Sequence, residues 1–500
     1  MQLRIPSAHA PIWVLAETVA AAAFSLVSML AVGAVIGPHA AGTGTVAMAA
    51  FLIAEVLVGA LFPDALVRLA RLEPRHADSA ATASVLLGAL GGVLLAALGP
   101  FLAEASGEPE VAWLALALAP LLPLSAFSGT ASGLYLRDQR FRLLSARLLL
   151  GQPVALAVGL ALARQGYGAW AMIAAQAIAT IVTFLLMLHG RPGLRPRLDR
   201  AALADLWPVA LPQLGGAAVL TGKYRIFLMA LGLTVVPGVL AVSHFAFRLV
   251  DAAVGIVWQT VTRIAMPRLC ALQEDPEALA ETYGDMVQFQ ALLGLPICLG
   301  IALTAPDVVA LLLGPRWEGM AGAAQVVALG ATLTFLYGDT TSLFVALGKA
   351  RWNFRVAVAT LALPLAVLLL TGPETPEGAA LAWTVPSLAL PPVLAVVVLR
   401  TLDRSLPWLL GRLLPGLAAA VVMVAAVLAV QEGLDLAGWP RLLAAVGAGA
   451  LAYGGVALAA LGGRLPRALQ TQRPRRPARD VARARPVAVR EPQAASSALP

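Results

Sequence analysis

Long apolar runs that recur along the whole chain constrain its fold more than any other feature. Each run is solid rather than alternating and has about the length that a helix needs to cross a bilayer. Hydrophobic residues make up 60% of the 500 residues and charged residues only 12%, so a water-soluble fold could not cover the apolar surface. The sequence therefore predicts an all-α polytopic membrane protein. Its fourteen predicted transmembrane helices lie at residues 12–36, 42–62, 80–102, 111–134, 148–163, 169–188, 205–231, 236–262, 287–305, 321–347, 356–371, 379–399, 413–430 and 441–461.

The basic residues predict how these helices are oriented. With the N-terminus in the cytoplasm, all but six of the 35 lysines and arginines fall in cytoplasmic loops or at the two ends of the chain. Only Arg164, Arg316 and Arg441 fall on the outer side, and adding or removing one helix would destroy this asymmetry. We therefore expect both termini in the cytoplasm. The net charge of +8 reflects this topology and a basic tail, so it does not indicate nucleic-acid binding.

A weak internal repeat relates the two halves of the chain. Sliding the sequence by 196 residues aligns a glycine, a phenylalanine, an acid and a second glycine of the second and eighth predicted helices. The aligned pairs are Gly42 with Gly238, Phe51 with Phe247, Glu55 with Asp251 and Gly59 with Gly255. Many transporters are built from such repeats, so the pattern predicts two parallel six-helix lobes around a central cavity. We place the lobes at 1–200 and 201–400, two additional transmembrane helices at 401–463 and a disordered basic cytoplasmic tail at 464–500.

Seven acids, lysines and arginines lie away from the ends of the predicted helices, where a charge is costly and usually faces a cavity or a partner. They are Glu17, Glu55, Lys223, Arg225, Arg248, Asp251 and Asp339. Arg248 and Asp251 are three residues apart, so they share a helix face and can pair. Either this pair is structural, or Arg248 lines a substrate cavity and Asp251 holds it in place. Asp251 and the other acids are candidates for ion coupling or for countering the cations.

The seventh predicted helix carries two of these cations and a group of helix-perturbing residues. Lys223 and Arg225 are two residues apart, which corresponds to about 200° of rotation, so both cannot face one point. We favour Arg225 as the residue that lines a substrate cavity, with Lys223 secondary. The prolines and glycines before them predict a bent or broken helix, as transporters use around a binding site. These residues are Pro208, Pro212, Gly215 and Gly216.

The sequence does not support an enzyme. Its five histidines are scattered, it has no recognisable hydrolase or nucleotide-binding motif, and no loop is long enough for a catalytic domain outside the membrane. Cys270 and Cys298 give neither a disulfide framework nor metal-ligand spacing. We therefore expect no cofactor and no bound metal.

Three stretches resemble a known family. They are GLYLRDQRFRLLSARLLLGQPVALAVGLALARQGYGAWAMIAAQ at 133–176, FAFRLVDAAVGIVWQTVTRIAMPRLCALQEDPEALAETY at 245–283 and APDVVALLLGPRWEGM at 305–320. These resemble bacterial polysaccharide flippases, the lipopolysaccharide and exopolysaccharide branch of the multidrug/oligosaccharidyl-lipid/polysaccharide (MOP) exporter superfamily.

The resemblance implies a two-lobed transporter of fourteen helices in the bacterial inner (plasma) membrane. Such a protein moves undecaprenyl-diphosphate-linked oligosaccharide repeat units to the periplasmic leaflet for O-antigen, capsule or exopolysaccharide synthesis. The partners that it implies are the lipid-linked oligosaccharide, membrane lipids, a polysaccharide polymerase and a chain-length regulator.

The chain departs from that family in the seventh predicted helix. Relatives often carry an Asp-Arg pair where this sequence has Tyr224 and Arg225, so the arginine matches and the acid does not. Proton coupling through that acid is therefore not carried over. Two other functions stay open: a multidrug or other amphiphile exporter of the same superfamily, and a membrane polysaccharide polymerase or ligase. The exporter would have twelve helices and a cavity dominated by acids, and the enzyme would have a long periplasmic loop, so the sequence favours the flippase.

Overall fold

The structure is a computed structural model that describes residues 12–69, 71–190, 194–220, 222–349 and 351–463. The predicted tail at 464–500 lies outside the described residues. Helices account for nearly all of the described chain, which contains no strand, so the prediction of an all-α protein is confirmed. The helices are α1 (Ile12–Gly59), α2 (Pro63–Arg68), α3 (Pro74–Ser106), α4 (Glu110–Leu118), α5 (Leu121–Arg137), α6 (Phe141–Arg164), α7 (Trp170–Gly190), α8 (Arg200–Leu220), α9 (Lys223–Gly232), α10 (Pro237–Cys270), α11 (Pro276–Leu312), the 3-10 helix η1 (Pro315–Trp317), α12 (Gly319–Thr334), α13 (Thr340–Ala346), α14 (Arg351–Thr371), α15 (Pro376–Thr401), α16 (Leu406–Gly433) and α17 (Trp439–Ala460).

The described helices include eleven segments that are long and apolar enough to cross a membrane. Every predicted transmembrane range falls on one helix or on two consecutive helices. The protein is therefore a multi-pass membrane protein. The number of fourteen crossings, the orientation and the internal repeat stay predictions.

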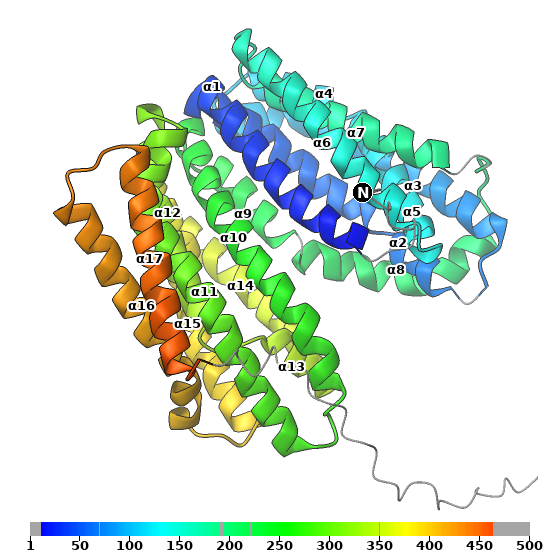
Figure 1. Ribbon diagram of the computed structural model, residues 1–500. Coiled ribbons are helices and arrows are strands. Elements are labelled where there is room, and N and C mark those ends of the chain that lie inside the picture. The colour runs from blue at the N-terminus through cyan, green and yellow to red at the C-terminus, as the bar shows by residue number, and fades with distance from the viewer. Residues whose placement is uncertain (1–11, 70, 191–193, 221, 350, 464–500) are drawn as a thin grey trace, which may run out of the picture.

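The helix α1 contains two of the predicted ranges because the chain reverses at Gly37. The φ angle of Gly37 is 79°, in the left-handed region that favours glycine, and Pro38 follows it. In Figure 1 the dark-blue first segment runs to the upper end of the molecule and the next segment returns beside it. The ranges 12–36 and 42–62 thus form a helical hairpin.

The predicted range 205–231 is broken, but not at its prolines. The helix α8 continues through Pro208 and Pro212 to Leu220, and α9 begins at Lys223 after Gly222. A proline removes one backbone hydrogen bond, which a helix among other helices can tolerate. The break further along instead lets α8 and α9 pack in different parts of the molecule.

Two groups of helices, α1–α8 and α9–α17, lie at an angle to each other in Figure 1. They meet where α1 packs against α10, and one buried apolar core draws residues from both helices. A Cβ atom on Gly42 would lie 1.8 Å from the carbonyl oxygen of Pro237, so only glycine permits this approach. The junction of α1 and α10 therefore sets the distance between the two groups.

The helix α8, with which the predicted second lobe begins at residue 200, packs against helices of both groups. Its Leu206 is buried in a core with Phe62 of the first group. The segment before α8 is also fixed to α3, because the backbone N–H of Arg195 donates to Asp78 Oδ1 at 3.0 Å. The lobe boundary at residue 200 stays a prediction.

The two predicted additional helices, α16 and α17, pack against α11. Arg412 of α16 hydrogen-bonds both Glu281 and Asp285 of α11, and Arg404 pairs with Glu277 one turn further along. These ion pairs and a shared apolar core attach the additional helices to the second group.

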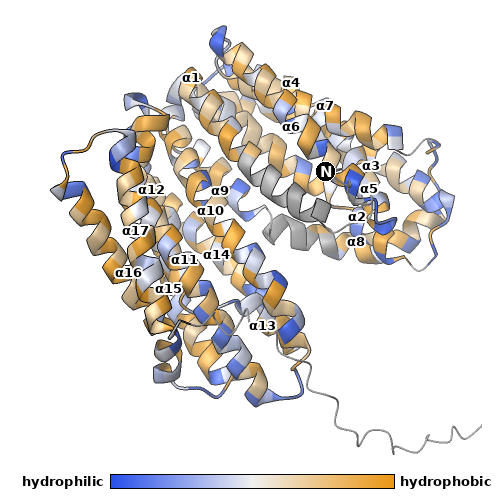
Figure 2. Ribbon diagram, in the orientation of Figure 1, coloured by the Kyte–Doolittle hydropathy of each residue, from blue (hydrophilic) through white to orange (hydrophobic). Residues whose placement is uncertain are grey.

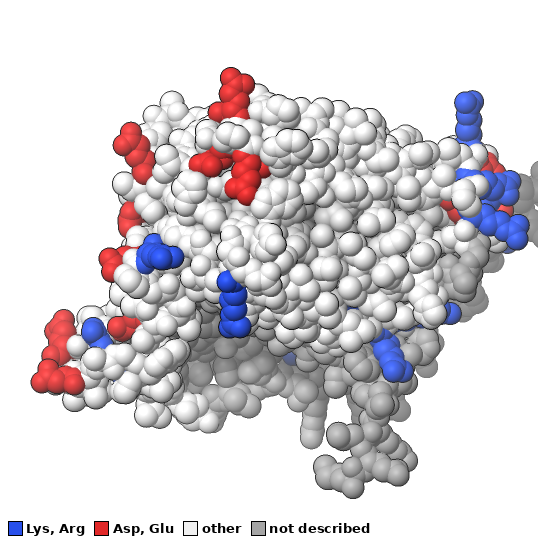
Figure 3. Space-filling model, turned by 90° about the horizontal axis from the view of Figure 1, so that it is seen from above, with Lys and Arg blue, Asp and Glu red and all other residues white. Residues whose placement is uncertain are grey.

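The outer surface is apolar along the helices, as Figure 2 shows. Leu370 and Leu451 expose 85% and 80% of their surface. Such exposure is unfavourable in water but not in contact with lipid. Seen from above in Figure 3, most acidic side chains lie toward one side of the face with a few basic ones among them, and the opposite edge carries mainly basic side chains. An apolar surface of this extent fits a protein surrounded by lipid.

The close approach at Gly42 gives a test of the contact between the two groups. We expect Gly42→Ala to lower the free energy of unfolding by about 1–3 kcal/mol, because the added methyl overpacks the contact with Pro237. Gly238→Ala is the matched control, since nothing lies within 4 Å of a Cβ atom there. Thermal unfolding in detergent measures both, and equal stability of the two variants would contradict the contact.

Candidate substrate site

Charged side chains meet where α9 and α10 face α1. Arg225 of α9 donates through Nη1 to the backbone carbonyl of Leu52 on α1 at 2.6 Å. Glu55 lies one turn further along α1 and accepts a hydrogen bond from Ser125 Oγ at 2.6 Å. The guanidinium of Arg225 interacts electrostatically with both Glu55 and Arg248. Arg225 therefore links the two groups of helices through a charge-assisted hydrogen bond.

The predicted pairing of Arg248 with Asp251 is present. Arg248 Nη1 lies 3.7 Å from Asp251 Oδ2, and the Asp251 side chain is 68% exposed. A contact of this length to an exposed carboxylate is weak and can exchange. Lys223 interacts electrostatically with the same carboxylate. Three cations and two acids thus occupy one region, with a net charge of +1.

Aromatic side chains pack around the part of α9 that carries Lys223 and Arg225. The Tyr224 hydroxyl lies 2.8 Å from His244 Nδ1, and the two rings stack. Tyr224 also packs edge-on against Phe247 and Trp383. Because Tyr224 lies between Lys223 and Arg225, this packing fixes the part of α9 that carries both cations.

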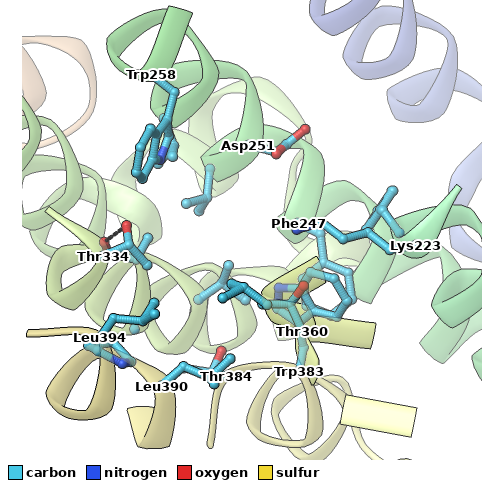
Figure 4. Close-up of a pocket in the computed structure, with 18 of the residues that line it drawn as sticks. Lys223, Phe247, Asp251, Trp258, Thr334, Thr360, Trp383, Thr384, Leu390 and Leu394 are labelled. Carbon is cyan, nitrogen blue, oxygen red and sulfur yellow. Dashed lines mark hydrogen bonds between the residues drawn. The ribbon is translucent and has the colours of Figure 1, made fainter. Parts of the chain in front are cut away.

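A cavity of about 320 Å³ adjoins the charged region (Figure 4). Residues of α9, α10, α12, α14 and α15 line it, so it lies within the second group of helices. Its charged lining residues are Lys223 and Asp251. Its other lining residues are Tyr224, Phe247, Val250, Val254, Trp258, Val327, Gly330, Ala331, Thr334, Tyr337, Val356, Thr360, Trp383, Thr384, Leu390, Pro391 and Leu394.

A protein family described as "Polysaccharide biosynthesis protein" matches residues 34–322, more than half of the chain. The chain belongs to this family. The matched range contains all five charged residues of the site, from Glu55 to Asp251, and ends before α13–α17. No curated protein matches the chain.

Solved structures show the fold of this polysaccharide biosynthesis protein. The lipid II flippase MurJ in an inward closed conformation superposes with a TM-score of 0.75 at 13% identity, covering 90% of this chain and 98% of MurJ. An inward-facing multidrug resistance MATE family transporter of the MOP superfamily gives a TM-score of 0.63 at 16% identity, with 77% and 94% covered. The chain therefore has the MOP fold, which these transporters share, and the family and fold agree with the expectation that it is not an enzyme.

The three predicted cations have different positions relative to the cavity. Lys223 lies on the wall of the cavity, although the sequence favoured Arg225, whose side chain points to the backbone of α1. Arg248 lies beside the cavity through its contact with Asp251. The cavity itself lies inside the second group of helices, so the predicted central cavity between two lobes stays a prediction.

Two predicted acids lie apart from this site. Asp339 is fully buried and caps α13: its carboxylate accepts hydrogen bonds from the Ser342 backbone N–H and hydroxyl and from Thr262 Oγ1. These bonds give Asp339 a structural role as a helix cap. Glu17 lies on α1, but its side chain lies outside the described residues.

Two parts of the site were missed from the sequence. His244 was regarded as one of several scattered histidines, yet it precedes Arg248 by four residues on α10 and therefore lies on the same helix face. That spacing could have identified it. Trp383 lies 159 residues after Tyr224, and only the tertiary fold brings these two rings together.

Asp339 tests the distinction between a helix cap and a counter-charge. Asparagine also caps helices well, so we expect Asp339→Asn to retain most of the stability although it removes the charge. Asp339→Ala should lose about 0.5–2 kcal/mol, because the Ser342 N–H loses its partner. Thermal unfolding compares the two variants, and a loss as large for Asn as for Ala would favour a role of the charge.

Proposed function

We propose that this polysaccharide biosynthesis protein is a flippase for undecaprenyl-diphosphate-linked oligosaccharides. It would move them from the cytoplasmic to the periplasmic leaflet of the bacterial inner membrane. The observation that carries the proposal is the charged region of Lys223, Arg225 and Arg248 among apolar membrane helices. The membership of a polysaccharide biosynthesis family supports the same substrate class.

The chemistry of the substrate explains why such cations are needed. A diphosphate cannot enter hydrocarbon bare, because the loss of water around its charges is too costly. Arginine replaces that water with paired N–H donors that match phosphate oxygens. The polyprenyl tail can stay in the lipid, while the sugar passes between the helices.

Arg225 and Arg248 are held by contacts of different strength. Arg225 is fixed by its short hydrogen bond to the Leu52 carbonyl, whereas Arg248 contacts the exposed carboxylate of Asp251 at 3.7 Å. An entering phosphate can therefore displace Asp251 from Arg248 without disturbing the helix contact at Arg225. Asp251 competes with the phosphate for Arg248, so it promotes release of the substrate and then neutralises Arg248 again.

Transport requires that access to this site alternates between the two sides of the membrane. The two groups of helices pack together mainly at α1 and α10, with further contacts of α1 with α9 and of α8 with α14, and lie at an angle to each other in Figure 1. Rocking about this junction changes which end of the groups is closed. Arg225 and Leu52 lie on opposite sides of the junction, so their hydrogen bond must reform or follow the movement.

The proposal predicts which arginines control flipping. In liposomes that contain the purified protein and a fluorescent lipid-linked oligosaccharide, we expect Arg225→Ala and Arg248→Ala to flip about ten- to a hundredfold more slowly. Each variant loses a charged hydrogen-bond donor to phosphate, worth about 1.5–3 kcal/mol. Arg164→Ala, at the exposed end of α6, is the control and should flip at the wild-type rate.

Unchanged flipping in both variants would contradict the assigned roles of these arginines. The same liposomes distinguish a flippase from a multidrug exporter. A protein that transports cationic dyes and leaves the lipid-linked oligosaccharide in place would overturn the flippase proposal itself.

A further inference from the structure

The cavity beside the charged region has an unusual lining for a space between apolar membrane helices. Two tryptophans, Trp258 of α10 and Trp383 of α15, contribute to different parts of its wall (Figure 4). The ring of Trp383 is held by Phe227, with ring centroids 4.8 Å apart, and by Phe247 at 6.0 Å. A ring held in this way offers a rigid apolar face to a ligand.

Three threonines add hydroxyl groups to the same cavity. Thr334 donates to the carbonyl of Ala331 at 2.7 Å and Thr360 donates to that of Ala357 at 2.8 Å. Because the hydroxyls of Thr334 and Thr360 already donate within their own helices, their oxygens remain available as acceptors for a ligand. The lining therefore presents acceptors to groups that carry O–H or N–H donors.

Thr384 provides the strongest indication of a ligand. Its side chain is 6% exposed, and its hydroxyl is buried without a hydrogen-bond partner among the described residues. A buried hydroxyl without a partner is costly, and because Thr384 lines the cavity, a molecule bound there could supply the partner. In Figure 4 Thr384 lies on the floor of the cavity, between the positions of Leu390 and Trp383.

The cavity also has a direction. Lys223 and Asp251 lie on one side of it in Figure 4, Thr334 and Leu394 lie on the opposite side, and Thr360 and Thr384 lie between them. A ligand with a charged group at one end and hydroxyl groups along the rest of its length would fit this order. A polyprenyl tail would not, because it offers no donors to the threonines and no partner for Lys223.

We propose that this cavity binds the sugar that is attached directly to the diphosphate of the substrate. The ring face of the sugar packs against a tryptophan, its hydroxyls bond the threonines, and the diphosphate stays at Lys223 and Arg248. A volume of about 320 Å³ is at the small end of the range for ligand pockets, so one or two sugar rings fit and the remaining oligosaccharide lies outside. This inference rests on the proposed flippase function.

Binding of three lipids to the purified protein in nanodiscs tests the inference. The probes are undecaprenyl diphosphate, the same lipid carrying N-acetylglucosamine, and the same lipid carrying galactose. We expect the wild type to bind at least one glycosylated lipid about tenfold more tightly than the bare lipid. The additional hydrogen bonds between the sugar and the threonines account for a gain of this size. Thr384→Val and Trp258→Leu should reduce this preference to less than about threefold, with unchanged affinity for the bare lipid.

Matched variants separate sugar binding from general damage to the fold. Thr384→Ser keeps the hydroxyl and should keep the preference. Thr332→Val lies two residues from Thr334 on α12 and outside the cavity, and Trp352→Leu removes a tryptophan that does not line it. Both controls should behave as the wild type.

Each outcome bears on a different claim. Equal binding of all three lipids by the wild type, or a preference that survives Thr384→Val and Trp258→Leu, would overturn the sugar site and leave the flippase proposal intact. Binding of all three lipids no tighter than that of phosphatidylglycerol would instead count against the proposed function.

Discussion

The cost of placing charge among membrane helices is the constraint on which the rest of this structure depends. Four of the five charged groups at the junction of α1, α9 and α10 have a compensating contact, and Lys223 interacts electrostatically with Asp251. Arg225 bonds a backbone carbonyl of α1, Glu55 accepts from Ser125, and Arg248 pairs with Asp251. Charged groups inside membrane helices often mark the path of a substrate or ion, so this compensated cluster supports the proposed function.

The same junction connects chemistry to movement. The two groups of helices approach closely where Gly42 meets Pro237, and the contact of Arg225 with Leu52 lies further along α1. The break between α8 and α9 lets α8 pack with the first group while α9 carries Lys223 and Arg225 toward the second. A change in the angle between the groups would therefore change the surroundings of the cations directly.

Local features of the sequence predicted those parts of the structure that depend on local spacing. Solid apolar runs gave the helices, and a separation of three residues gave the pair of Arg248 with Asp251. Tertiary packing decided the rest. The prolines of α8 did not mark its break, and Asp339 became a buried helix cap. Contacts between distant segments, such as that of Tyr224 with Trp383, leave no pattern in a single sequence.

The position of the diphosphate is the most direct test of the central claim. Electron cryo-microscopy of the protein in nanodiscs, with undecaprenyl-diphosphate-linked oligosaccharide bound, would locate it. The account predicts phosphate density in contact with the guanidinium of Arg248, close to Lys223 and Arg225, with the carboxylate of Asp251 displaced from its partner. Phosphate density elsewhere, with the pair of Arg248 and Asp251 intact, would contradict it.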